Sequence, residues 1–166
     1  METRSLPTQY KADGNRLVGY GIVWDSPATI TERGRTFNEI VRRGSINFPE
    51  DVIATFNHDT SRLLGRLSSG TLRLHQDDVG VKFEIDLPEH AHDIRELVQR
   101  GDLKGASFTF SVRPGGEKWD GSTRELTALD VFELGPVTIP AYPSTSLGLR
   151  SKLNVIKAKL GILARK

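Results

Sequence analysis

The sequence predicts a mainly β protein with surrounding helices, of the α+β class, whose strands form a mostly antiparallel barrel or sandwich. Sixteen glycines and eight prolines are spread through 166 residues, and this density of turn residues indicates many short strands. Apolar and polar residues also alternate with a period of two in several short segments. One segment of the body has clear helical periodicity, so strands should greatly outnumber helices.

The composition narrows the class of protein. A length of 166 residues fits one domain with a substantial core, and 37% hydrophobic with 27% charged residues is typical of a globular protein. The absence of cysteine excludes disulfides, thiolate metal ligands and a cysteine nucleophile. No apolar run approaches membrane-spanning length, and the first residues lack the basic and apolar blocks of a signal peptide. We therefore expect no membrane partner.

The net charge of +2 is unevenly distributed. Six of the 23 basic residues, and none of the 21 acidic residues, lie from Arg150 onward, so residues 1–149 carry a net charge of −4. Because this body is mildly acidic, we expect it not to bind nucleic acid. We divide the chain into a body of residues 1–149 and a basic C-terminal tail of residues 150–166.

The tail has an apolar stripe at helical spacing, formed by Leu153, Ile156, Leu160 and Leu163. Gly161 lowers the stability of such a helix by roughly 1 kcal/mol relative to alanine, so we expect the helix to form against a partner surface. The tail is thus predicted to be an amphipathic docking element outside the catalytic fold. A disordered basic end is the alternative.

The first part of the body contains two predicted strands. Residues 1–13 carry too little periodicity to be assigned, and residues 16–24 are predicted to form a strand. Residues 28–50 are predicted to be rich in loops. Residues 51–56 form the second strand, which presents His58 just beyond its end.

A hairpin and a helix follow. Residues 71–75 and 81–86 alternate on either side of a polar turn, which predicts a β-hairpin. Residues 88–101 place apolar side chains on one helical face and end on a glycine, which suits a helix C-terminus. A further hairpin is predicted at Asp120-Gly121, and residues 123–132 are predicted to be extended.

The segment that contains Ser107 has the clearest strand pattern. Its apolar and hydroxyl side chains occupy opposite faces, with Ala106, Phe108, Phe110 and Val112 on one and Ser107, Thr109 and Ser111 on the other. A serine held between large anchoring neighbours is a candidate nucleophile where a base can reach it. The alternative is an ordinary polar residue on the outer face of a strand.

His58 is the candidate base, because a strand end presents a side chain with little freedom. A polar strand cap is the alternative. Serine chemistry also needs a third group that fixes the tautomer of the base. The other histidines, His75, His90 and His92, lie beside a turn or near the start of the predicted helix and are interpreted as surface residues. They match no zinc motif, so we expect no metal site.

Asp130 and Glu133 are the two candidates for the third group. Asp59 is a poor candidate, because adjacent strand residues point to opposite faces. Asp130 and Glu133 are surrounded by apolar residues, where a carboxylate is costly to bury without a partner. The parity of an uninterrupted strand puts these two on opposite faces, so only one of them can face the histidine.

Five motifs follow one another along the body. They are Asn57-His58-Asp59; Leu64-Gly65-Arg66; Asp77-Asp78-Val79-Gly80; Arg100-Gly101-Asp102 with Gly105-Ala106-Ser107-Phe108-Thr109-Phe110; and Glu133-Leu134-Gly135-Pro136-Val137-Thr138-Ile139-Pro140-Ala141-Tyr142-Pro143. In this order, over about residues 15–148, they resemble the tailed-bacteriophage prohead maturation protease family, the caudovirus prohead serine proteases. That family is similar to the herpesvirus assemblins, serine proteases built on an antiparallel β-barrel ringed by helices.

The resemblance implies a serine endopeptidase with a Ser-His-acid triad. Ser107 matches the family's nucleophile, His58 its base and Glu133 its acid, and no cofactor is implied. Gly135 departs from the serine expected at its position in many relatives. Backbone amides must receive the oxyanion, and a turn at Gly65-Arg66 is the candidate for their source.

The resemblance also implies partners and a location. The expected substrates are the major capsid protein, its scaffold region and the protease itself, inside the prohead in the host cytoplasm, with self-association. One alternative is a non-enzymatic structural or adaptor β-domain of the virion, in which Ser107 and His58 are ordinary polar residues lying far apart. A second alternative is an esterase, but the chain contains no Gly-x-Ser-x-Gly elbow.

Overall fold

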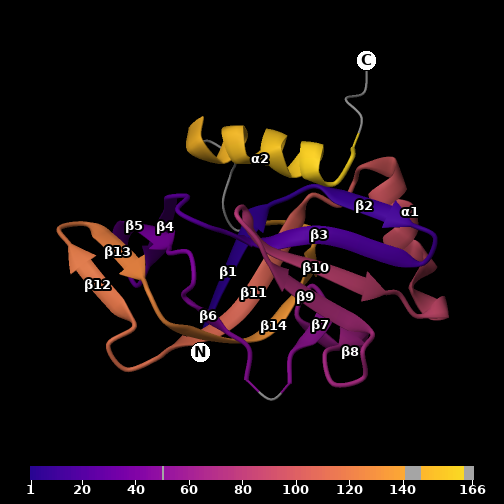
Figure 1. Cartoon of the computed structure of the whole chain (residues 1–166), viewed down its shortest axis with the longest axis horizontal. Coiled ribbons are helices and arrows are strands. Elements are labelled where there is room, and N and C mark those ends of the chain that lie inside the picture. Colours follow the sequence, from indigo (N-terminus) through magenta and orange to yellow (C-terminus); the bar gives the residue numbers. More distant parts are fainter. Residues whose placement is uncertain (50, 141–146, 163–166) are drawn as a thin grey trace.

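The protein is described by a computed structural model that covers residues 1–49, 51–140 and 147–162 (Figure 1). The described strands form three sheets, and the described helices are a short 3-10 helix, η1, and two α-helices, α1 and α2. The predicted mainly β fold with a few helices is therefore confirmed.

The central sheet contains the strand of Ser107. Its strands lie in the order β1-β11-β14-β7-β8, and β6 pairs with β14 beside this path. The strands are β1 (Glu2–Pro7), β6 (Ile46–Asn47), β7 (Ile53–Phe56), β8 (Asp59–Arg66), β11 (Gly105–Val112) and β14 (Leu129–Val137).

Two four-stranded sheets complete the fold. The second sheet has the order β2-β3-β10-β9 and the third sheet the order β12-β13-β5-β4. The second sheet comprises β2 (Tyr10–Asp13), β3 (Arg16–Val23), β9 (Leu72–Gln76) and β10 (Gly80–Asp86). The third comprises β4 (Ala28–Glu32), β5 (Arg35–Val41), β12 (Glu117–Asp120) and β13 (Thr123–Leu126), and it stands at one end of the molecule (Figure 1).

The antiparallel barrel expected from the sequence is not formed by the described strands. The three sheets are open, and no ladder joins β1 to β8, the two edges of the central sheet. Several pairings are also parallel, and strands paired in this way are joined by long connections and not by tight hairpins. These pairings are β6 and β7 with β14, and β13 with β5.

Two stretches contain strands that the sequence pattern does not predict. Residues 1–13, whose weak periodicity predicts no element, form β1 and β2. The prediction that residues 28–50 are rich in loops is wrong, since they contain β4, β5 and β6. Alternation along β1 is hard to recognise because Arg4 points inward and its Nε donates to Oε1 of buried Glu39 at 2.7 Å. The β4–β5 hairpin turns at Arg33-Gly34, where both residues have positive φ and the glycine adopts this conformation without strain.

The predicted hairpins and the strand of Ser107 are present. β9 pairs with β10, β12 pairs with β13, and β11 spans Gly105–Val112. The predicted helix is also confirmed: η1 (Glu89–Ala91) leads into α1 (His92–Arg100), and Ile94 is fully buried. Gly101 ends α1 in the left-handed conformation with φ of 78°.

The main core lies between the central and second sheets. A Cβ atom at Gly21 of β3 would lie 2.6 Å from Cγ of Leu134 in β14, so only glycine permits this approach of the two sheets. Phe110 of β11 and Phe83 of β10 are fully buried in the same core. Each such side chain contributes roughly 1.5–3 kcal/mol through burial, so β11 is firmly anchored on its apolar face.

Helix α2 (Leu147–Lys159) lies along the second sheet (Figure 1). Ile156 of the helix and Leu160, just beyond its end, are buried in a second, smaller core formed with Tyr20, Val23 and Val79. The helix begins before the predicted boundary at residue 150, and Leu163 of the predicted stripe lies outside the described residues. The docking role of the tail stays a prediction.

An ion pair adds to the contact of α2 with the body. Nζ of Lys159 lies 3.5 Å from Oδ2 of Asp77 and also pairs with Asp78. The hydrogen bond to Asp78 raises the pKa of Lys159. Neither α2 nor the other helices of the described residues combine the length and the apolar character needed to cross a membrane.

The packing of α2 predicts a difference between two neighbouring positions. Ile156→Ala should lower the free energy of unfolding by about 2–4 kcal/mol, because it deletes a fully buried side chain from the smaller core. Val155→Ala is the matched control, since Val155 is 45% exposed, and it should change stability by no more than about 0.5 kcal/mol. Urea denaturation of the full chain measures both, and equal midpoints would contradict the packing of α2.

Candidate active site

Ser107 lies on β11, which is an interior strand of the central sheet. It pairs with Ser5 of β1 on one side and with Gly135 of β14 on the other. Its neighbours Ala106 and Phe108 point into the core, as the alternation predicts. Ser107 itself is only 1% exposed, so it is not the outward polar residue that the alternative interpretation requires.

His58 lies in a tight turn between β7 and β8. Asn57 and His58 are the two central residues of this hairpin, and both have left-handed backbones, with φ of 55° and 60°. Positive φ at both central positions is the geometry of a type I′ turn. For residues other than glycine this geometry is costly, and such strain persists only where the surroundings hold it.

The side chain of Asn57 attaches this turn to the end of β14. Its Oδ1 accepts hydrogen bonds from the backbone N–H of Thr138 at 2.8 Å and from the Thr138 hydroxyl at 3.1 Å. The backbone N–H of Asn57 also donates to the carbonyl of Pro136 at 3.0 Å. These bonds fix the position of the turn relative to β14, and therefore the position of the His58 ring.

Ser107, His58 and Glu133 form one hydrogen-bonded line. His58 Nε2 lies 2.7 Å from Ser107 Oγ, and His58 Nδ1 lies 3.0 Å from Glu133 Oε2. The side chain of His58 is 35% exposed and that of Glu133 is 16% exposed, so the line runs from a buried hydroxyl to a partly open imidazole. A hydroxyl, an imidazole and a carboxylate in this order can support nucleophilic acyl transfer.

A β-bulge explains why Glu133 faces the histidine. The β11–β14 ladder pairs Thr109 with Glu133 but Phe110 with Val131, so Phe132 is an extra residue. The expectation that an uninterrupted strand puts Asp130 and Glu133 on opposite faces is therefore wrong. Both carboxylates share the face of the hydroxyl row, since cross-strand partners point the same way.

Position along the strand, and not parity, separates the two carboxylates. Asp130 pairs with Ser111, further along β11 from Ser107, and accepts a 2.6 Å hydrogen bond from Asn47 Nδ2. Arg113 Nε lies 3.2 Å from the same Asp130 oxygen. Asp130 thus has its own partners, whereas Glu133 is hydrogen-bonded to His58.

Two threonines at the site were not assigned a role from the sequence. The hydroxyl of Thr55 donates to Glu133 Oε1, and the hydroxyl of Thr109 donates to Glu133 Oε2 at 3.1 Å. Thr109 belongs to the predicted hydroxyl face of β11, but no pattern singles out Thr55. Gly135 makes room for it, because a Cβ atom at Gly135 would lie 2.3 Å from the carbonyl oxygen of Thr55.

The remaining polar residues of the motifs lie in other arrangements. Asp59 accepts hydrogen bonds from the hydroxyl and N–H of Ser61, and this hydroxyl lowers the pKa of Asp59. The turn expected at Gly65-Arg66 is wrong, since both residues pair within the β7–β8 ladder. His75 Nε2 lies 3.9 Å from Glu84 Oε1. Within the described ranges, no three His, Asp or Glu side chains are arranged to hold a metal ion.

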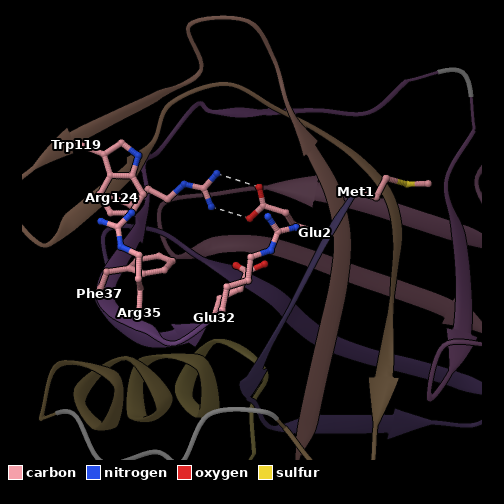
Figure 2. Close-up of a pocket in the computed structure, with 8 residues that line it drawn as sticks. Met1, Glu2, Glu32, Arg35, Phe37, Trp119 and Arg124 are labelled. Atoms are coloured by element: carbon pink, nitrogen blue, oxygen red, sulfur yellow. Dashed lines mark hydrogen bonds and ion pairs between the residues drawn. The ribbon is translucent and has the colours of Figure 1, made fainter.

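A separate pocket of about 390 Å³ lies between β1 and the third sheet (Figure 2). Glu2, Phe37, Trp119 and Arg124 are among its lining residues. Arg124 forms a two-pronged ion pair with Glu2, with Nη1–Oε2 and Nη2–Oε1 distances of 2.6 and 2.9 Å (Figure 2). None of the described residues that line this pocket belongs to the line of Ser107, His58 and Glu133.

A serine hydroxyl, an imidazole and a carboxylate in one hydrogen-bonded line are the groups that serine hydrolases use, and comparison with known families agrees with this class. A family model described as caudovirus prohead serine protease matches residues 2–158, so the chain belongs to that family. The family is a protease of phage prohead maturation, which acts within the prohead inside the host cell. Comparison with curated proteins and with solved structures gives no match.

The close approach of Thr55 to β14 predicts that Gly135 does not tolerate a side chain. Gly135→Ala should lower the free energy of unfolding by about 3 kcal/mol, because the added Cβ meets backbone atoms that cannot rotate away. Gly14→Ala is the control: Gly14 has positive φ and open space around it, so only backbone strain of about 1 kcal/mol is expected. Thermal unfolding compares the two, and equal losses of stability would contradict the close approach.

Proposed function

We propose that this chain is a serine endopeptidase in which Ser107 is the nucleophile, His58 the general base and Glu133 the group that orients the histidine. The observation that carries the proposal is the continuous hydrogen-bonded line through the three side chains, at 2.7 and 3.0 Å. These side chains come from β11, from the β7–β8 turn and from β14, which are distant in sequence. Membership of the prohead protease family supports the same chemistry.

The geometry supports a two-step acyl transfer. Ser107 Oγ attacks the scissile carbonyl carbon while His58 Nε2 takes the hydroxyl proton, and the tetrahedral intermediate collapses as His58 gives that proton to the leaving amine. A water molecule then attacks the acyl-enzyme by the same route and releases Ser107. Glu133 accepts the Nδ1–H of His58 throughout, which holds the tautomer and balances the charge of the imidazolium.

One further acceptor competes for the Ser107 proton. Ser107 Oγ lies 2.8 Å from the carbonyl oxygen of Arg4 in β1 as well as 2.7 Å from His58 Nε2. A hydroxyl has a single hydrogen, so donation to Arg4 leaves Nε2 without that proton. The reactive rotamer of Ser107 is the one in which the hydroxyl hydrogen points to His58.

The proposed substrates are capsid and scaffold polypeptides, with the protease itself as a further substrate. The major capsid protein and its scaffold region are the partners that a role in prohead maturation requires. Self-association inside the prohead would bring several copies near these substrates. Restriction to the prohead would also protect the proteins of the host cytoplasm from a serine protease.

The non-enzymatic alternative requires Ser107 and His58 to be ordinary polar residues lying far apart. The 2.7 Å contact between Ser107 Oγ and His58 Nε2 favours the enzymatic proposal over a purely structural or adaptor role. The two possibilities differ in one measurable property, which is the production of cleaved capsid protein.

The first test removes the nucleophile. Ser107→Ala should leave a folded protein but abolish processing of the capsid protein and of the chain itself, because loss of a nucleophile typically lowers the rate by several orders of magnitude. Co-expression with the cognate capsid protein, followed by mass spectrometry of the products, measures both. Ser111→Ala is the control, as Ser111 occupies the same strand face without contacting His58. Undiminished processing by Ser107→Ala would end the proposal.

The second test decides which carboxylate serves His58. Glu133→Gln should keep the fold and lower single-turnover cleavage about a hundredfold or more, because the amide can stabilise the wrong tautomer and cannot balance the imidazolium. Asp130→Asn should have much less effect, since Asp130 bonds to Asn47 and Arg113. Both variants are compared on one peptide at one pH, with folding checked by circular dichroism. A crippled Asp130→Asn beside a nearly silent Glu133→Gln would reverse the assignment.

A further inference from the structure

We propose that Thr55 and Thr109 are positioning residues that fix the carboxylate plane of Glu133 so that Oε2 faces His58. This inference rests on the proposed function, because it assigns the two threonines a role in the same catalytic line. Neither threonine touches His58 or Ser107 through a hydrogen bond in the structure, so each would act through Glu133.

The two hydroxyls donate to different oxygens of the Glu133 carboxylate. Thr55 donates to Oε1, whereas Thr109 donates to Oε2, the oxygen that also lies 3.0 Å from His58 Nδ1. Among the described residues, Oε1 has Thr55 as its hydrogen-bond partner and Oε2 has Thr109 and His58. The carboxylate therefore cannot rotate about its last torsion without breaking bonds at both oxygens.

Glutamate needs this restraint more than aspartate would. Its side chain has three torsions, and the terminal torsion is broad, so an unrestrained carboxylate samples many orientations. Thr55 and Thr109 project from β7 and β11, the strands on either side of β14, and hold the group from both flanks. The restraint is built into the sheet and does not depend on a mobile loop.

The position of Thr55 is itself specified by the backbone. Thr55 is 1% exposed, and its peptide group lies against Gly135, where any side chain would displace it. Removal of the Thr55 hydroxyl would leave Oε1 of Glu133 without its hydrogen-bond partner. The chain offers a contrast in Thr8, which is also 1% exposed but whose hydroxyl has no partner among the described residues.

The experiment measures how reactive Ser107 is without requiring a known substrate. The full chain is treated with a fluorophosphonate: Ser107 Oγ forms a bond to phosphorus, the P–F bond breaks to release fluoride, and His58 takes the hydroxyl proton. Saturation kinetics separate the maximal labelling rate, kinact, from the half-saturating concentration, KI. The compared proteins are the wild type, Ser107→Ala, Thr55→Val, Thr55→Ser, Thr109→Val and Thr8→Val.

The expected result is a loss in kinact that follows the hydroxyl. Thr55→Val should lower kinact about tenfold with KI unchanged, since the variant keeps the shape of threonine and loses one hydrogen bond to a charged group. Thr55→Ser keeps the hydroxyl and should restore most of the rate. Thr109→Val should lower kinact severalfold, and Thr8→Val should match the wild type.

A spectroscopic readout separates positioning from general stability. The Nδ1–H proton of His58, hydrogen-bonded to a carboxylate, should give a low-field NMR signal in the wild type. That signal should persist in Thr55→Ser and Thr8→Val and should shift or broaden in Thr55→Val. A variant that is merely less stable would show the same signal in its folded fraction.

The outcomes distinguish this inference from the proposed function. Labelling that needs Ser107 in the wild type, together with wild-type kinact in Thr55→Val, would overturn the positioning role alone. A wild type that is labelled no faster than Ser107→Ala would overturn the proposed function and the inference with it. If Thr55→Val does not fold, wild-type kinact in the partly exposed Thr109→Val overturns the inference.

Discussion

The bulge at Phe132 in the β11–β14 ladder is the feature on which the arrangement of the site depends. Without it, Glu133 would share the face of Val131 and Phe110 and point into the apolar core. One extra residue reverses the parity of the following stretch, so Glu133 joins Ser107 on the polar face and Leu134 enters the core. β14 can therefore place apolar side chains in the core on both sides of the bulge and still present Glu133 on the polar face.

β1, which pairs with the strand of Ser107 on the side away from β14, is linked to the third sheet by ion pairs. Arg4 of β1 bonds to buried Glu39 of the third sheet, and Arg124 joins Glu39 to Glu2 with Nη1–oxygen distances of 3.0 and 2.6 Å. The hydrogen bond from Arg124 lowers the pKa of Glu2. Buried ion pairs of this kind add little net stability after desolvation but specify one geometry. The carbonyl of Arg4 accepts a hydrogen bond from Ser107, so this network is in contact with the site.

Much of the fold and site could be predicted from local pattern, and the failures have physical causes. The strand of Ser107 and helix α1 have strong periodicity in the sequence, and the structure has the strand and the helix that this periodicity predicts. β1 has no alternating apolar pattern to predict it, because Arg4 is the inward-facing residue and pairs with buried Glu39. The hydrogen bond between Thr55 and Glu133 could not be predicted either, since it depends on the bulge and on the space left by Gly135, and neither has a signal in one sequence.

The turn that carries His58 has an unfavourable backbone conformation, and hydrogen bonds to β14 and the segment after it hold the turn in place. The left-handed conformations of Asn57 and His58 are unfavourable in isolation, at roughly 1–3 kcal/mol each. The Asn57 side chain offsets this cost by bonding to Thr138, which places the turn at the end of the strand that carries Glu133. Two contacts therefore hold the imidazole: the bonds of Asn57 fix the backbone of the turn, and the carboxylate of Glu133 is hydrogen-bonded to Nδ1. Under the proposed function, side chains held this way need little reorganisation as charge develops, because hydrogen bonds fix both the turn of His58 and the carboxylate of Glu133.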